Sequence, residues 1–152
     1  MTLSVGDLAP DFELKDQHGQ SVRLSSLRGE KAALVVFYPW AFSGVCGGEL
    51  CALKDRQQEI VGDDVVLLTI STDPMYALRA FADHNDFDFP LLSDFWPHGA
   101  VASAYGVLSE EVGIALRGTF LVDKDGVVRW SVVNDIPDAR DIDDYKRAIA
   151  DL

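Results

Sequence analysis

Two cysteines lie five residues apart in the sequence, and the first, Cys46, follows the apolar run 32–38 at the start of a helical pattern. Ser43 suits the N-cap of that helix, which would place Cys46 at the third helical position. Free backbone N–H groups and the positive end of the helix dipole would then face the sulfur and favour its thiolate form. The position therefore fits a nucleophilic thiol, although a buried structural cysteine explains these residues equally well.

A reactive Cys46 also needs a nearby cation. A free cysteine has a pKa of ~8.5, and lowering it to about 6 requires roughly 3.4 kcal/mol, of which a helix end supplies about 1–2 kcal/mol. Arg117 is the best candidate because it stands immediately before a predicted core strand; the alternative is a solvated charge at a strand terminus. Arg28 and Arg79 lie in segments that we expect to be exposed. Glu49, three residues after Cys46, would oppose the thiolate unless it pairs with a cation.

Pro39 and four aromatic residues each have two interpretations. Pro39 removes a backbone donor and restricts φ after the strand, so it either shields the sulfur or simply ends the strand. The aromatic residues, which lie in or near predicted loops, either pack in the core or line an apolar access pocket. They are Trp40, Phe42, Phe95 and Trp96.

The charge and composition of the chain exclude several classes of protein. The formal net charge is −12, and such an acidic chain repels nucleic acid phosphates and anionic membranes. No apolar run approaches the ~20 residues of a membrane-spanning helix. Residues 1–14 do not resemble a secretory signal, so we expect a cytoplasmic protein with no membrane association. Two cysteines are too few for a disulfide scaffold, and the scattered histidines do not complete a zinc site, so we expect no metal.

The elements that must position these residues alternate between strand and helix. Apolar runs with branched residues predict buried strands, apolar residues at helical spacing predict helices, and Asp125-Gly126 predicts a hairpin turn. This order predicts a single α/β domain over residues 1–152, with a central mixed sheet flanked by helices on both faces. We expect, in chain order, a hairpin at 12–14 and 22–24, a strand at 32–38, a helix at 48–61, a strand at 64–72, a helix at 74–85, a strand at 89–92, a helix at 98–106, a hairpin at 118–133 and a helix at 141–152.

The sequence resembles the peroxiredoxin family over essentially its whole length. Pro39, Ser43 and Cys46 match the family signature Pro-x-x-x-Thr/Ser-x-x-Cys, and Arg117, in Arg-Gly-Thr-Phe, is similar to the active-site arginine of the family. The stretches APDFEL, VVFYP and FPLLSD also occur in the family order. Within the family, residues 90–107 and 117–126 most resemble the AhpE-type peroxiredoxins, the alkyl hydroperoxide reductase E group.

This resemblance implies a thioredoxin-like fold and a thiol peroxidase. Cys46 would be the peroxidatic cysteine, whose thiolate attacks one peroxide oxygen and becomes a sulfenic acid. Arg117 would hold the thiolate and polarise the peroxide bond, and Ser43, where threonine is commoner, would hydrogen-bond the peroxide. Pro39 would shield the sulfur, and Glu49 would orient Arg117 or a neighbouring backbone group.

The resemblance also implies the reactants and partners of such an enzyme. No metal or organic cofactor is implied, because the electrons come from thiols. The reductant would be mycothiol with a glutaredoxin-like partner, or thioredoxin, and the oxidant would be hydrogen peroxide, an organic hydroperoxide or peroxynitrite. Peroxiredoxins commonly form homodimers or larger homo-oligomers, and the aromatic loop 94–99 is our candidate interface.

Cys51 departs from the AhpE pattern, which has one cysteine, and its spacing resembles the Q-type, or bacterioferritin-comigratory, peroxiredoxins. There the resolving cysteine lies five residues after the peroxidatic one. On an ideal helix, five residues separate the Cα atoms by roughly 8.6 Å, whereas a disulfide needs less than about 7 Å. Cys51 is therefore either a resolving cysteine that acts after the helix unwinds locally, or an inert buried residue beside Leu50 and Leu53.

Two other functions use the same thiol. A thioredoxin-like disulfide reductase would carry Cys-x-x-Cys at the start of the helix, which is absent here. A peroxide-sensing thiol switch or chaperone would oxidise Cys46 once and then act on a partner. Turnover with a reductant separates the peroxidase from the sensor.

Overall fold

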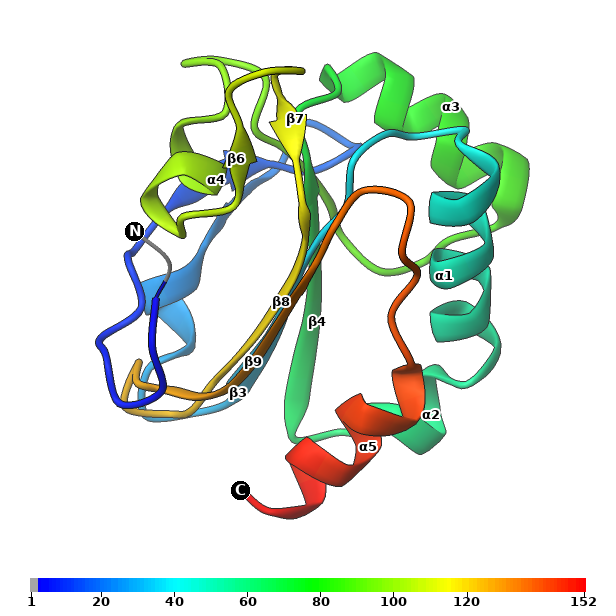
Figure 1. Ribbon diagram of the computed structural model, residues 1–152. Helices are drawn as coiled ribbons and strands as arrows, with labels where there is room; N and C mark the ends of the chain where they lie inside the picture. Colours follow the sequence, from blue (N-terminus) through cyan, green and yellow to red (C-terminus); the bar gives the residue numbers. More distant parts are fainter. Residues whose placement is uncertain (1–2) are drawn as a thin grey trace.

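A seven-stranded mixed sheet forms the centre of the protein (Figure 1). The computed structural model describes residues 3–152, with the side chains of residues 45–47 outside the described part. The strand order is β2-β1-β5-β4-β3-β8-β9, in which β3, β4 and β5 run parallel and the other pairings are antiparallel. The strands are β1 (Glu13–Lys15), β2 (Ser21–Arg23), β3 (Ala32–Phe37), β4 (Val65–Ser71), β5 (Leu91–Ser93), β8 (Arg117–Val122) and β9 (Val128–Asn134).

Helices cover both faces of this sheet, as predicted (Figure 1). Alternate residues of β3 belong to two different cores, Leu34 and Val36 to one and Ala33 and Val35 to the other. Burial on both faces explains why this strand is a continuous apolar run in the sequence. One face carries α1 (Gly44–Asp55), α2 (Gln57–Ile60), α3 (Met75–Asn85) and α5 (Ile142–Ala150), and the other carries α4 (Ala100–Ala104) and the 3-10 helix η1 (Leu24–Leu27).

The predicted helix at 48–61 is two helices in the structure. α1 begins at Gly44, as the N-cap assignment of Ser43 predicts, but before the apolar stretch 48–61, and Arg56, with φ −117° and ψ 18°, separates it from α2. The glycines in the first turns of α1 have low helix propensity, so the apolar periodicity indicated a start that was too late.

The predicted helix at 98–106 is also shorter than expected, because only residues 100–104 are α-helical. A small second sheet, which we did not predict, follows it and consists of β6 (Leu108–Ser109) and β7 (Ile114–Ala115). Strands of two residues are too short to show an alternating pattern in the sequence. The hairpin between β8 and β9 is confirmed, with Gly126 at φ +84° in its turn. None of the described helices is long and apolar enough to cross a membrane.

The topology places the start of α1 at the edge of the sheet where the parallel strands end. The parallel strands β3, β4 and β5 end at the same edge, and residues 38–43 lead from the end of β3 into α1. In α/β proteins, binding and catalytic sites form at this carboxyl edge.

Candidate active site

Residues 38–43 carry two of the predicted site residues into α1. The N–H of Tyr38 donates to the carbonyl of Ile70 (3.0 Å), so the segment begins against the end of β4. Pro39 is buried directly after it. Ser43, with φ −71° and ψ 138°, is the N-cap residue of α1, and Cys46 is therefore the third helical residue, as predicted. The side chain of Cys46 lies outside the described residues.

The hydroxyl of Ser43 is available to a bound molecule. Ser43 occupies the N-cap position, but its side chain makes no capping hydrogen bond to α1. In the part of the chain that the structure describes, the hydroxyl has no other hydrogen-bond partner. A free hydroxyl at a helix start is suited to hydrogen-bond a small polar substrate.

The four aromatic residues that we considered for core packing are exposed instead. Trp40 is 42%, Phe42 57%, Phe95 48% and Trp96 80% exposed, so core packing is the wrong interpretation for them. Phe42 has φ +65°, and its ring packs against Phe81 of α3 at a centroid distance of 5.0 Å. Phe42 directly precedes the N-cap Ser43 of α1, and Trp40 lies three residues before it.

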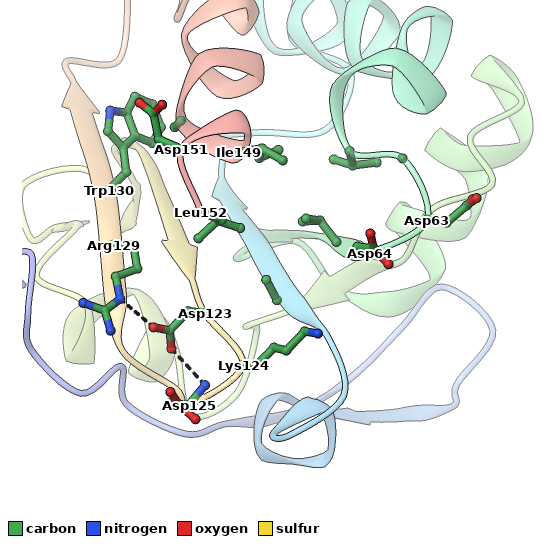
Figure 2. A pocket seen from close by; sticks show the side chains of 15 residues that line it. Asp63, Asp64, Asp123, Lys124, Asp125, Arg129, Trp130, Ile149, Asp151 and Leu152 are labelled. Carbon is green, nitrogen blue, oxygen red and sulfur yellow. Dashed lines mark hydrogen bonds and ion pairs between the residues drawn. The ribbon is translucent and has the colours of Figure 1, made fainter.

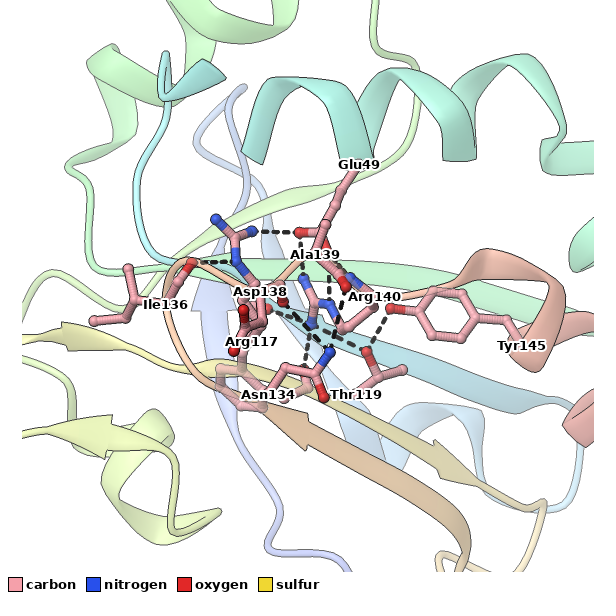
Figure 3. Close-up of polar contacts among 11 residues, drawn as sticks. Glu49, Arg117, Thr119, Asn134, Ile136, Asp138, Ala139, Arg140 and Tyr145 are labelled. Atoms are coloured by element: carbon pink, nitrogen blue, oxygen red, sulfur yellow. Dashed lines mark hydrogen bonds and ion pairs between the residues drawn. The ribbon is translucent and has the colours of Figure 1, made fainter. Parts of the chain in front are cut away.

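Arg117 is buried rather than solvated, which corrects one of its two interpretations. It begins β8, and only 1% of its surface is exposed. Its Nη1 donates to Oε1 of Glu49, and its Nε donates to the carbonyl of Ile136 (Figure 3). Its Nη2 has no hydrogen-bond acceptor among residues 3–44 and 48–152. The expected contact between Glu49 and Arg117 is therefore present, and one terminal nitrogen remains free to donate.

A second buried arginine, Arg140, was not found from the sequence. Its Nε and Nη2 donate to the two carboxylate oxygens of Glu49, each at 3.0 Å, and its backbone N–H donates to Oε2 at 2.6 Å (Figure 3). Its Nη1 donates to the carbonyls of Phe37 (2.7 Å) and Gly118 (3.0 Å) and to Oγ1 of Thr119 (3.1 Å). Arg140 stands in an acidic loop between β9 and α5, where its sequence surroundings resemble those of a solvated charge.

The cluster of Glu49, Arg117 and Arg140 carries one excess positive charge. Burial raises the pKa of Glu49, but hydrogen bonds and charge from Arg140, together with the charge of Arg117, bring that pKa below its usual value. Glu49 is therefore ionised at neutral pH, and one carboxylate faces two guanidinium groups. Position 46 is one helical turn before Glu49 in α1, because residues three apart on a helix share a face. A net positive charge therefore lies around Glu49, one helical turn after position 46 in α1.

Cys51 is partly buried on the same helix. Its Sγ lies 3.7 Å from Oδ1 of Asn85 in α3, and its side chain packs against the core beneath α1. Because α1 is continuous from residue 44 to residue 55, the two cysteine positions keep the spacing of an intact helix in this state. A disulfide between them requires the helix to unwind, as the sequence predicts.

A cavity of about 940 Å³ lies at the other end of the sheet (Figure 2). Its lining comes from the amino ends of β3 and β4, the β8–β9 turn and the end of α5. It includes none of the predicted site residues. The start of α1 is therefore separate from this cavity.

The chain is similar to known proteins over nearly its full length. Residues 5–131 match the AhpC/TSA family. Alkyl hydroperoxide reductase E of Mycobacterium tuberculosis is 48% identical over 150 residues, which cover 99% of this chain and 98% of that protein.

Two solved structures also resemble it. The crystal structure of peroxidoxin BcpB from Mycobacterium tuberculosis has 34% identity and a TM-score of 0.83, covering 97% of this chain and 95% of that one. The reduced 2-Cys peroxiredoxin of Plasmodium vivax has 29% identity and a TM-score of 0.87, covering 96% of this chain and 80% of that one.

Proposed function

Because this chain belongs to the AhpC/TSA family as an AhpE-type peroxiredoxin, and is thus a thiol-dependent peroxidase, we propose that it reduces hydrogen peroxide and organic hydroperoxides at Cys46. The thioredoxin-like fold predicted from the sequence is confirmed by the similar solved structures. The observation that best supports Cys46 as the reacting residue is the pair of guanidinium groups, Arg117 and Arg140, bound to Glu49, which lies one turn beyond Cys46 in α1.

The proposed oxidation transfers one oxygen atom to sulfur. The thiolate of Cys46 attacks one oxygen of the peroxide, a sulfur–oxygen bond forms, and the oxygen–oxygen bond breaks. The sulfur is oxidised to a sulfenic acid. The other oxygen leaves with the bond electrons, takes up a proton and departs as water or as an alcohol.

The neighbouring residues have separate proposed roles in this step. The free Nη2 of Arg117 would stabilise the thiolate and the charge that develops on the peroxide, since it is a cationic donor already fixed by Glu49. The hydroxyl of Ser43 would hydrogen-bond the peroxide. Pro39, buried beside the loop, would keep water from the sulfur without adding a competing donor.

A thiol must return the sulfenic acid to the starting state. One thiol condenses with the sulfenic acid to give a mixed disulfide and water, and a second thiol then reduces that disulfide. We propose mycothiol with a glutaredoxin-like partner, or thioredoxin, as the source. Cys51 would resolve the sulfenic acid only if α1 unwound, and α1 is continuous over both cysteine positions.

We also propose that the enzyme is a cytoplasmic homodimer. The loop 94–99 presents Phe95 and Trp96 at the surface, and exposed aromatic rings of this kind favour association between protein chains. Sedimentation velocity of Trp96→Ala tests this assignment: a dimer in the wild type and a monomer in the variant support it, and identical sedimentation contradicts it.

Stopped-flow oxidation tests the peroxidase assignment. The wild type, Cys46→Ser and Cys51→Ser are mixed with hydrogen peroxide and with an organic hydroperoxide, and the change in intrinsic tryptophan fluorescence is followed. We expect the fast phase to disappear only in Cys46→Ser; a Cys46→Ser protein that reacts at the wild-type rate would refute the proposal. Peroxide consumption that stops after one equivalent despite excess thiol reductants would indicate the peroxide-sensing switch instead.

A further inference from the structure

The loop of residues 39–43 must be held in an unfavourable conformation. Pro39 has no backbone N–H to anchor it, and Phe42 has φ +65°, a left-handed conformation that residues with side chains seldom adopt. Such a conformation persists where surrounding contacts determine it. The geometry of this loop sets where Ser43 and the first turn of α1 lie.

Asp73 supplies the hydrogen bond that anchors this loop. The backbone N–H of Ala41, at the centre of the loop, donates to Oδ2 of Asp73 at 2.9 Å. Within the described part of the chain, no other hydrogen bond reaches residues 39–42 from outside the loop. The ring of Phe42 adds only packing, against Phe81 and His84.

Asp73 is itself held by the ends of the neighbouring strands β4 and β5, one through its carboxylate and the other through its backbone. The hydroxyl of Ser71, the last residue of β4, donates to the same Oδ2 at 2.7 Å. The hydroxyl of Ser93, the last residue of β5, donates to the backbone carbonyl of Asp73 at 2.6 Å. Ser71 and Ser93 are also register partners in the sheet. The anchor therefore connects the loop to the rigid carboxyl edge of the sheet.

We infer that Asp73 is a positioning residue of the active site, which holds residues 39–43 so that Ser43 and the start of α1 face the peroxide correctly. This inference rests on the proposed function of Cys46. Asp73 acts through the backbone of Ala41, and what it contributes is an acceptor oxygen in a fixed place. A negative charge near a thiolate makes the thiolate less stable. The acceptor oxygen of Asp73 therefore favours the reaction by holding the loop, whereas the charge of Asp73 disfavours the thiolate form of Cys46.

Two substitutions separate the acceptor from the charge. Because a single oxygen, Oδ2, accepts both the Ala41 N–H and the Ser71 hydroxyl, the amide oxygen of Asp73→Asn can accept both bonds without the charge. Asp73→Ala removes the acceptor and the charge together. Asp83→Asn and Asp83→Ala are the matched controls, since Asp83 is an exposed carboxylate of α3 with no hydrogen-bond partner among the described residues.

The experiment compares two reactions of Cys46 in each folded variant. Peroxide oxidation is followed by stopped flow, and alkylation by iodoacetamide is followed across pH by peptide mass. We expect Asp73→Ala to slow peroxide oxidation by about tenfold or more, since small displacements of positioned groups cost rates of this order. Asp73→Asn should remain within about threefold of the wild type, and both Asp73 variants should share one alkylation pH profile, because both lose the same charge. The Asp83 variants should match the wild type in both reactions.

The inference is wrong if Asp73→Asn and Asp73→Ala slow the peroxide reaction equally, or if neither slows it. If Asp73→Ala does not fold, Ser71→Ala replaces it. We expect Ser71→Ala to slow peroxide oxidation and to leave the pH profile of alkylation unchanged. An unchanged rate of peroxide oxidation in Ser71→Ala would overturn the inference. If peroxide does not oxidise Cys46 even in the wild type, the proposed function itself is wrong. If the wild type reacts and the Asp73 variants react at the same rate, only the positioning role of Asp73 is wrong.

Discussion

Glu49 of α1 accepts a hydrogen bond from Nη1 of Arg117 at the start of β8, and both side chains are almost fully buried. The two residues are 68 positions apart in the chain. Arg140 completes the cluster by occupying both oxygens of the same carboxylate. Glu49 therefore does not cancel the positive charge near the start of α1; it holds two guanidinium groups there and leaves one charge in excess.

Removal of the Arg117 charge should slow the reaction with peroxide. We expect Arg117→Met to lower the second-order rate constant by about 10²–10³-fold, the usual effect of losing one donor that stabilises transition-state charge. The apparent pKa of the Cys46 thiol should rise as well, because the nearby positive charge is lost. Stopped-flow oxidation across pH measures both quantities. Arg129→Met is the control, since Arg129 is an exposed arginine of β9; equal effects of the two substitutions would contradict the role of Arg117.

Loss of the Glu49 carboxylate should destabilise the fold. Glu49→Ala leaves two buried guanidinium groups without their carboxylate, and breaking a buried ion pair in this way costs about 3–5 kcal/mol. Urea unfolding at pH 7 measures the change in the free energy of unfolding. Glu59→Ala is the control, because Glu59 pairs with Arg56 and Lys146 at the exposed surface, where ion pairs add little to stability. Similar losses in both variants would contradict this prediction.

The stability of the protein should depend on the ionisation of Glu49 at acidic pH. Burial raises the pKa of Glu49 in the folded protein, but the hydrogen bonds and charge of Arg140 and the charge of Arg117 hold that pKa below the usual value of a glutamate. A carboxyl whose folded pKa is lowered contributes stability above its unfolded pKa, and that contribution disappears as pH falls through the folded pKa. We therefore expect Glu49→Gln to lose less stability than the wild type between about pH 5 and pH 3. Urea unfolding at several pH values measures this, and parallel pH curves for the two proteins would contradict it.

Cys51 should not form a disulfide with Cys46 while α1 is intact. Both positions belong to one continuous helix, and an ideal helix places their Cα atoms roughly 8.6 Å apart, beyond disulfide reach. After one equivalent of peroxide and no thiol, intact-mass analysis should show the gain of one oxygen atom, in the wild type and in Cys51→Ser alike. The loss of two hydrogen atoms in the wild type alone would instead show that Cys51 resolves the sulfenic acid and that the first turns of α1 unwind.

Local sequence patterns predicted the elements well where burial follows a regular period. The run 32–38 predicted β3 because both faces of that strand are buried, and Asp125-Gly126 predicted the turn after β8 because it needs a positive φ. The patterns failed where no period exists. Apolar periodicity misses the glycine-rich start of α1, which only the N-cap at Ser43 indicates, and β6 and β7 are too short to show a period.

The amino-acid sequence by itself places Cys46 at the third residue of a helix and identifies the family of the chain, because caps, turns and motifs depend on residues close together in the chain. The sequence does not reveal that Glu49 pairs with Arg117 and Arg140. This pairing exists because β8 pairs with β3 beneath α1, and because the loop after β9 returns across the same edge of the sheet. No local pattern distinguishes Arg140 from a solvated charge, since its burial depends on contacts with residues far away in the chain.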